Sequence, residues 1–356
     1  MPSFKNILRS LKLGLFLALV LFLPVLNAQQ YLIKESQNPS EKVIRAAIDI
    51  GSGATKLRVA EVNLKTHKIE RILVNESFTV QYQEQLAKSP NNTFDEEVMK
   101  TGIEAIRKSA EIAKNHQAQK VIAVATASFR KAANSLDLID KIYTETGVRV
   151  YVIDQDLEGK LAFNAVLSQG NYNPKDLVVW DIGGGSLQLT SMDEQGGYKI
   201  YRGEIASIHF KNMMIQEIQK KSIHQVTTPN PIATHEIHKG IDKSKEIAEN
   251  VDKIFKERMQ KPNTQVVGVG NIFAYGIYPA VGKKSPFKQQ ELTQALFNMA
   301  NKDDLQVGGG DYANVQVSNT ILILGYMRAL NLHQMDVLDV NNADGAMLYP
   351  EFWAAN

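Results

Sequence analysis

Two glycine turns, each placed after a short apolar run, are the residues whose types and spacing point most directly to chemistry. The first turn follows the run 43–48, and the second follows the run 177–180. Each run has the length of a strand and is followed by an aspartate and, two residues later, by a glycine. The residues of interest are Asp49, Gly51, Ser52 and Gly53 in the first turn, and Asp181, Gly183, Gly184, Gly185 and Ser186 in the second.

Turns of this kind can bind phosphate. Glycine lacks a Cβ, so backbone N–H groups can close around phosphate oxygens, and a serine hydroxyl adds a donor. An aspartate at the strand end can hold a hydrated Mg²⁺ beside them. The alternatives are two ordinary hairpins, with each aspartate only an Asx cap. The matched context of the turns favours two hairpins that face each other across a phosphate, with Asp49 and Asp181 as the metal candidates.

Three charged residues outside the turns are further candidates. Arg130 follows the buried run 121–125, and its planar guanidinium matches the oxygens of a transferring phosphate. Lys56 could reach phosphate, or it could be a solvated lysine on an exposed strand. Glu158 lies between the expected domains, where a carboxylate can deprotonate an attacking water. The alternative for Glu158 is an acid favoured by a helix N-terminus.

The elements that must position these residues alternate between strands and helices, which indicates a mixed α/β fold. In the first half the sequence predicts strands at 43–49, 56–62, 68–76, 121–125 and 149–153, and helices at 93–115 and 134–147. Asn92 or Thr93 is the expected N-cap of the first helix. In the second half it predicts strands at 177–181, 266–270 and 337–340, with a hairpin through 202. The helices expected there span 157–169, 207–221, 233–260, 314–330 and 345–354.

Several segments, in this order and spacing, resemble the exopolyphosphatase / guanosine pentaphosphate phosphohydrolase (Ppx/GppA) family of the actin-like ATPase superfamily. They are Asp49–Ser52 with Lys56, Ala125–Arg130 with Asn134, Glu158-Gly159, Asp181–Ser186 and Gly268–Asn271. The resemblance covers roughly 43–345. It implies two ribonuclease-H-like domains around a central phosphate-binding cleft, and a Mg²⁺-dependent release of terminal phosphate from polyphosphate. It also implies that Glu158, the acid directly before a small residue, activates the water.

Two segments depart from the family pattern. The third glycine turn continues as Asn271-Ile272, and the C-terminal motif reads Asn342-Ala343-Asp344-Gly345, which puts an alanine and a shorter acid where the family has a cation and a carboxylate. These departures keep a non-catalytic polyphosphate or phosphate sensor as an alternative. A second alternative is an apyrase-like extracellular nucleotidase, which the lack of cysteine and the Gly-Gly-Ser sequence of the second turn disfavour.

The N-terminus predicts export. Lys5, Arg9 and Lys12 precede an almost wholly apolar stretch at 13–26 and then Ala28, the pattern of a signal peptide over 1–28, so we expect a periplasmic or secreted protein. Cleavage would remove three cations and no acid, taking the formal charge from +2 to −1. A near-neutral chain has no net positive charge that would attract nucleic acid, so no nucleic-acid partner is expected. No membrane contact is expected after signal removal.

The expected organisation is a signal peptide, an exposed lead-in at 29–42, domain I at 43–155, domain II at 156–344 and a C-terminal helix at 345–356 that packs back on domain I. The expected partner is polyphosphate or a nucleoside polyphosphate. The sequence leaves a homodimer open.

Overall fold

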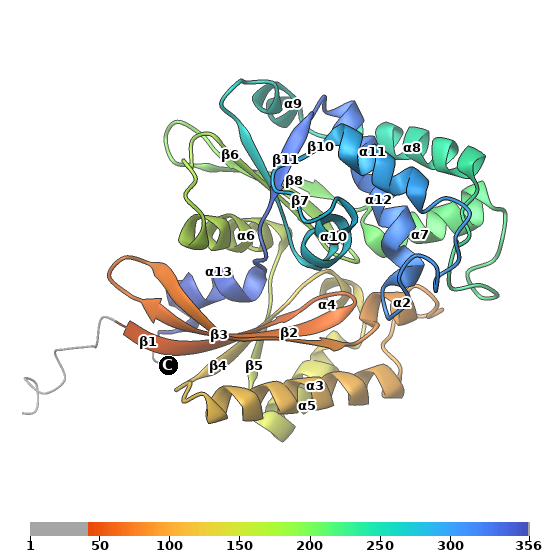
Figure 1. Ribbon diagram of the computed structural model, residues 1–356. Helices are drawn as coiled ribbons and strands as arrows, with labels where there is room; N and C mark the ends of the chain where they lie inside the picture. Colours follow the sequence, from red (N-terminus) through yellow and green to blue (C-terminus); the bar gives the residue numbers. More distant parts are fainter. Residues whose placement is uncertain (1–41, 355–356) are drawn as a thin grey trace, which may run out of the picture. The chain divides into compact units, whose positions relative to one another are not determined.

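The protein is described by a computed structural model that covers residues 42–354. The residues from Ile44 onward belong to one compact unit. This unit contains two mixed sheets with their helices, which we call domain I and domain II (Figure 1). The predicted two-domain α/β fold is therefore confirmed. The predicted signal peptide lies outside the described residues. Across residues 42–354, no helix combines the length and apolar character that crossing a membrane requires.

Domain I is built on a five-stranded sheet of order β3-β2-β1-β4-β5. β4 lies parallel to both β1 and β5, whereas β2 and β3 are antiparallel. The helices α3 and α5 cover one face of this sheet, and their apolar residues join one core with those of the strands (Figure 1). The bounds are β1 (Lys42–Ile50), β2 (Ala54–Asn63), β3 (Lys68–Thr79), α2 (Tyr82–Leu86), α3 (Glu96–Asn115), β4 (Val121–Ala125), α4 (Ala127–Lys131), α5 (Ser135–Thr146) and β5 (Arg149–Val152).

Domain II repeats this scheme with one added strand. Its order is β10-β11-β9-β6-β7-β8, in which β6, β9 and β11 are parallel while β7 and β8 continue antiparallel. The strand that carries the glycine turn, β1 or β6, has the same place in both sheets. The strand bounds are β6 (Leu177–Ile182), β7 (Leu187–Met192), β8 (Tyr198–Gly203), β9 (Gln265–Val269), β10 (Phe287–Lys288) and β11 (Gln334–Val337).

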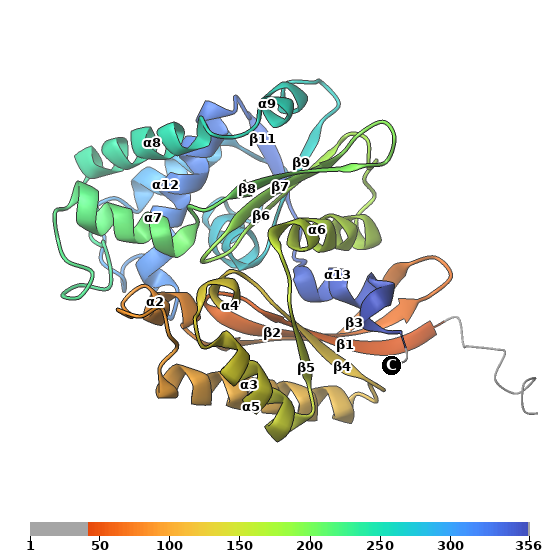
Figure 2. The ribbon, with the colours of Figure 1, turned by 180° about the vertical axis from the view of Figure 1, so that it is seen from behind.

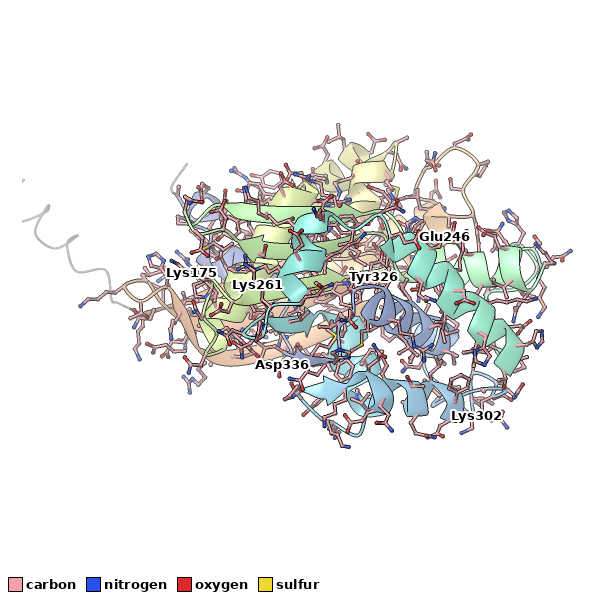
Figure 3. The ribbon with its side chains drawn as sticks, turned by 90° about the horizontal axis from the view of Figure 1, so that it is seen from above. Lys175, Glu246, Lys261, Lys302, Tyr326 and Asp336 are labelled. Atoms are coloured by element: carbon pink, nitrogen blue, oxygen red, sulfur yellow. The ribbon has the colours of Figure 1, made fainter. Side chains whose placement is uncertain are left out.

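Helices cover both faces of the second sheet. On one face α12 packs against α8 and α7, and Tyr326 of α12 lies inside the core against Trp180, with ring centroids 5.4 Å apart (Figures 2 and 3). On the other face lies α6, and α13 packs on α6. The helices from residue 155 onward are listed here, where η1 and η2 are π-helical turns and η3 is a 3₁₀ turn. Their bounds are α6 (Gln155–Gln169), α7 (Ser207–Met213), η1 (Met214–Ile218), α8 (Thr234–Ala248), α9 (Lys253–Met259), η2 (Ile272–Ile277), α10 (Tyr278–Ala280), α11 (Gln289–Asn298), α12 (Ala313–Ala329), α13 (Asn342–Leu348) and η3 (Pro350–Phe352).

Gly345 allows α13 to lie directly on α6. A Cβ added at this position would come within 2.1 Å of the Leu161 carbonyl oxygen, a backbone atom that cannot move aside. The α13 helix also contacts β2, β3 and β4 of domain I. The end of the chain is thus packed against elements of both domains.

Most predicted strands and helices are confirmed, but some boundaries were wrong. The N-cap of α3 is Asp95, whose carboxylate accepts the Val98 N–H at 2.8 Å, and not Asn92 or Thr93. The charged helix expected at 233–260 is two helices, α8 and α9, and Val251 between them is buried in the core. The helix expected at 207–221 continues past α7 only as the π-helical turn η1.

The C-terminal elements begin earlier than expected. The strand expected at 337–340 is β11 (Gln334–Val337), and the helix expected at 345–354 is α13, which ends at Leu348. A reciprocal cap starts this helix: the Asn341 side chain accepts the Ala343 N–H at 2.9 Å, and Asp344 accepts the Asn341 N–H at 2.8 Å. Asn341 and Asp344 have the spacing of a capping box, which is a local signal for a helix start in the sequence.

Candidate active site

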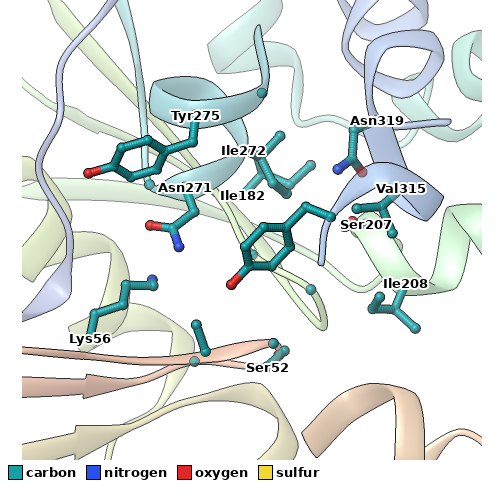
Figure 4. A pocket seen from close by; sticks show the side chains of 18 of the residues that line it. Ser52, Lys56, Ile182, Ser207, Ile208, Asn271, Ile272, Tyr275, Val315 and Asn319 are labelled. Carbon is teal, nitrogen blue, oxygen red and sulfur yellow. The ribbon is translucent and has the colours of Figure 1, made fainter. Parts of the chain in front are cut away.

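A cavity of about 130 Å³ is lined by both domains, at the place where the two glycine turns meet (Figure 4). Ser52 and Lys56 enter it from domain I, and Asn271 and Tyr275 come from the domain II side. The predicted residues among its lining are Asp49, Gly51, Ser52, Gly53, Lys56, Glu158, Asp181, Gly183, Gly184 and Ser186. Residues far apart in sequence are thus brought to one place by the repeated position of β1 and β6.

The two turns touch each other directly. Each is closed by a backbone hydrogen bond, from Gly51 N–H to the Ala54 carbonyl at 2.9 Å and from Gly183 N–H to the Ser186 carbonyl at 3.0 Å. A Cβ added at Gly184 would lie 2.7 Å from the Cβ of Ser52. Glycine is therefore required here by the close approach of the other turn, in addition to any need for open backbone N–H groups.

Gly185 is required for a similar reason, although it does not line the cavity. A Cβ at this position would lie 2.9 Å from the Cβ of Ala127 and 2.9 Å from Ser52 Oγ. The second turn is thus wedged against both the first turn and the helix α4 of domain I. Any side chain at this position would push the domains apart.

Asp49 and Asp181 lie with Lys56 at the cavity wall. Lys56 Nζ donates to Asp49 Oδ2 at 2.8 Å, and the other carboxylate oxygen of Asp49 is buried without a hydrogen-bond partner. Burial on its own lowers the pKa of Lys56, but the contact with Asp49 and the charge of Asp181 outweigh it. The net result is a raised pKa, so Lys56 stays protonated.

Asp181 is held by a residue from α13. Asn342 Nδ2 donates to Asp181 Oδ2 at 3.3 Å, while the side-chain oxygen of Asn342 is buried and unpartnered. Burial raises the pKa of Asp181; Lys56 opposes this and the charge of Asp49 adds to it. The free oxygens of Asp49 and Asn342, beside the Asp181 carboxylate, are hard oxygen ligands that suit a hydrated Mg²⁺. Within residues 42–354, no group of three or more His, Cys, Asp or Glu side chains forms a metal cluster, so such an ion would keep several waters.

Glu158 is buried at the cavity, in the first turn of α6, and Arg130 lies behind it. Arg130 donates to Glu158 Oε2 at 2.8 Å, to Ser186 Oγ at 3.1 Å and to the Ile153 carbonyl at 2.7 Å. Gln188 also donates to Glu158, at 3.3 Å. Three of the five N–H groups of the guanidinium are thus engaged, and Arg130 does not line the cavity. In the structure it contacts Glu158, and the predicted contact with phosphate stays a prediction.

The protonation of Glu158 is set by competing effects. Burial raises its pKa above the ordinary carboxyl range; the charge of Arg130 opposes this rise, and the charges of Asp181 and Asp49 add to it. A buried carboxyl with a raised pKa is what a general base needs in order to take a proton from water near neutral pH.

The comparison with protein families shows the family of the chain. The model of the Ppx/GppA phosphatase family matches residues 59–348. The chain belongs to the Ppx/GppA phosphatase family. The resemblance that the motifs suggested is therefore confirmed over most of the chain.

Solved structures of the family share the fold. An exopolyphosphatase from Cytophaga hutchinsonii is 20% identical, with a TM-score of 0.65 over 86% of this chain and 97% of that one. A family member from Aquifex aeolicus is 18% identical, with a TM-score of 0.63 over 86% of this chain and 97% of that one. At these identities, the likeness shows the fold alone.

Curated relatives match over shorter stretches. The bifunctional 3-dehydroquinate synthase/phosphatase of Fusobacterium nucleatum is 29% identical over 46% of this chain and 25% of its own length. Exopolyphosphatase 1 of Mycobacterium leprae is 35% identical over 26% of this chain and 28% of its own length. The matches therefore span only about a quarter of each relative.

The segments that depart from the family pattern occupy different places. Gly270 has a φ of 84°, and a Cβ there would lie 3.3 Å from Asp181 Oδ1, so the third turn is fitted against the second. Asp344 lies outside the cavity lining and is fully buried, with Arg58 Nε 3.5 Å away. The C-terminal segment instead contributes Asn342 to the cavity.

Sequence reasoning missed much of the domain II side of the cavity. Beside Asn271 and Asn342, which belong to the two segments that depart from the family pattern, the lining there includes Tyr275, Asp311, Tyr312 and Asn319. The Gly-rich loop at 308–310 and the third glycine turn were visible signals close to these residues. The side chains themselves are of ordinary types, so only the fold reveals that they meet.

Proposed function

We propose that the protein is a phosphoanhydride hydrolase that releases terminal phosphate from inorganic polyphosphate or a related phosphoanhydride. The observation that carries the proposal is the direct contact of the two glycine turns, Ser52 against Gly184, at a cavity that also holds Glu158. Hydrolysis of a phosphoanhydride needs clamped phosphates, compensated charge and a positioned water. The cavity offers groups for each of these needs.

The residues would share the work as follows. Backbone N–H groups of the two turns, with the hydroxyls of Ser52 and Ser186, bind phosphate oxygens. Glu158 takes the proton of the attacking water, and Arg130 holds the carboxylate in place. Lys56 contributes a fixed positive charge. Asp49, Asp181 and Asn342 would hold Mg²⁺, which offsets phosphate charge when bound.

The charges of the cavity support a metal requirement. Four lining residues carry carboxylates, Asp49, Glu158, Asp181 and Asp311, against the single ammonium of Lys56. A polyanion entering these surroundings meets repulsion unless cations accompany it. A divalent ion between the carboxylates and the phosphates removes that conflict.

The proposal is tested by measuring phosphate release from polyphosphate, ATP and guanosine pentaphosphate by the full chain with Mg²⁺. We expect release from at least the inorganic substrate. Tight binding of polyphosphate with no release across pH and metal conditions would establish the sensor alternative in its place.

A second candidate is a nucleotidase, which the apolar part of the cavity favours. Tyr275, Tyr312, Ile272, Ile208 and Val315 line it on the domain II side, and aromatic and aliphatic side chains suit a nucleobase. In the same assay, a kcat/KM for ATP or guanosine pentaphosphate well above that for inorganic polyphosphate would select this candidate.

Removal of divalent metal should abolish turnover, and added Mg²⁺ should restore it. The affinity for Mg²⁺ should also depend on pH. The pKa of Asp181 is raised, so this carboxyl binds a proton at a pH where an exposed aspartate is ionised, and metal and proton compete for it. We expect the affinity, measured by calorimetry, to fall as the pH drops toward and below the raised pKa. An affinity that stays constant from pH 8 to pH 5 would exclude Asp181 from the metal site.

A further inference from the structure

The edge strand β3 of domain I donates hydrogen bonds to domain II residues that line the cavity. Thr79 Oγ1 donates to Asp311 Oδ2 at 2.7 Å, and Asn75 Nδ2 donates to the Tyr275 hydroxyl at 3.2 Å. Asn75 and Thr79 are four residues apart on one strand, so their side chains share a face. Their partners, Asp311 and Tyr275, both line the cavity. We call the Thr79–Asp311 contact the clasp.

The clasp lies beside the first glycine turn. Thr79 is paired in register with Ala54, the residue that closes that turn, and Val80 N–H donates to the Gly53 carbonyl at 3.2 Å. The clasp therefore crosses the cleft next to the expected phosphate clamp.

The backbone before Asp311 is shaped to bring this carboxylate across the cleft. Gly308, Gly309 and Gly310 have φ values of 131°, 67° and 78°, a region that side-chain-bearing residues rarely adopt. Three such residues in a row turn the loop immediately before α12. Asp311 is thus placed by a dedicated loop and is fixed at its tip by Thr79.

A carboxylate in this place conflicts with a long polyanion. Domain II has seven lysines that a long polyanion could use as a basic strip; of these, Lys211 is fully buried and pairs with Glu84 at 2.6 Å, and Lys284 pairs with Glu291. The others are Lys220, Lys221, Lys239, Lys283 and Lys288, and none of the seven lines the cavity. A chain of phosphates leaving past the clasp would meet a negative charge there and no cation of this set.

The size of the cavity agrees with the charge argument. A volume of about 130 Å³ is on the scale of a cavity that takes up one benzene molecule. That is roughly the size of one phosphate group. A long polymer would have to extend past the rim, where the clasp closes one side.

We propose that Asp311, fixed by Thr79, is a specificity-determining residue that restricts this site to short phosphoanhydrides and disfavours long-chain polyphosphate. The inference rests on the proposed function, since it assigns the substrate class of the same site. Inorganic tripolyphosphate and nucleoside triphosphates both belong to the favoured class.

The test separates the charge of Asp311 from its hydrogen bond. Asp311→Asn keeps an oxygen that accepts from Thr79 and removes the charge, whereas Thr79→Val removes the donor and keeps the side-chain volume. For each variant, kcat/KM is measured on long-chain polyphosphate and on tripolyphosphate with Mg²⁺. We expect the ratio of long to short substrate to rise about tenfold in Asp311→Asn, because one repulsive charge is gone. A smaller rise is expected in Thr79→Val, where the carboxylate is freed to turn away.

Asp242→Asn is the matched control, because Asp242 is an exposed carboxylate on α8, 75% accessible, and the net charge changes equally. Its ratio should equal that of the parent. A parent that prefers the long chain, or an Asp311→Asn ratio equal to that of the control, overturns the inference and leaves the proposed function standing.

Binding of both polyphosphates to the same proteins, measured by calorimetry, separates a failure of the inference from a failure of the proposed function. If the parent releases no phosphate but binds tripolyphosphate more tightly than the long chain, and Asp311→Asn removes this preference, the inference holds for a sensor. If the parent binds neither polyphosphate, the inference and the proposed function fall together.

Discussion

Replacing Glu158 with glutamine should lower the turnover of phosphoanhydrides by about 100- to 10,000-fold, the usual contribution of a general base. Substrate binding should stay close to that of the parent, because the amide keeps the shape of the side chain. The carboxylate lies at the cavity, and Arg130 and Gln188 both donate to it. Glutamine still offers one oxygen to these donors but cannot take a proton from water.

The measurement is phosphate release under saturating and limiting substrate, so that kcat and KM are separated. Glu246→Gln is a suitable control, since Glu246 is exposed on α8 of domain II (Figure 3). A Glu158→Gln rate within threefold of the parent would remove Glu158 from the mechanism.

The pH profile offers an independent check on the same residue. A base must be deprotonated to work, so the rate of the parent should rise with pH through the raised pKa of Glu158. The acid limb should therefore lie above the range of an exposed glutamate, which is about 4.3. In Glu158→Gln this limb should disappear from the residual activity.

The sequence predicts the part of the cavity that the two glycine turns form, because that part depends on short local patterns. A strand followed by an aspartate and glycines is visible within a few residues, and β1 and β6 present two such patterns at equivalent places in their sheets. The family resemblance then fixes which residues face each other. The same local logic finds most strands of both domains.

The other part could not be predicted because it depends on long-range packing. Asn342 reaches Asp181 only because α13 lies on α6, which the absence of a side chain at Gly345 permits. Asp311 reaches Thr79 only through the folding of the glycine loop before α12. Arg130 is a further example: its type suggested a phosphate contact, and only the fold shows its hydrogen bonds to Glu158, Ser186 and the Ile153 carbonyl.

Arg130→Ala should therefore act mainly through Glu158. Removing the guanidinium takes away the charge that lowers the pKa of Glu158, while its burial and the charges of Asp181 and Asp49 remain. The pKa of Glu158 should rise further, and the acid limb of kcat/KM should move to higher pH by about one to three units, the usual effect of a close opposite charge. At neutral pH this corresponds to a loss of roughly 10- to 1,000-fold, because that fraction of the base becomes protonated.

Two variants make this prediction specific. Arg130→Lys keeps a positive charge near Glu158, so its acid limb should lie between those of the parent and of Arg130→Ala, although a lysine cannot replace the three-way contact of the planar guanidinium. Arg107→Ala removes an arginine that pairs on the surface with Glu145, and its profile should match the parent. If Arg130→Ala loses activity with no displacement of the acid limb, Arg130 acts on the substrate directly, as the sequence first suggested. That result would exclude the role of Arg130 in positioning Glu158 and lowering its pKa.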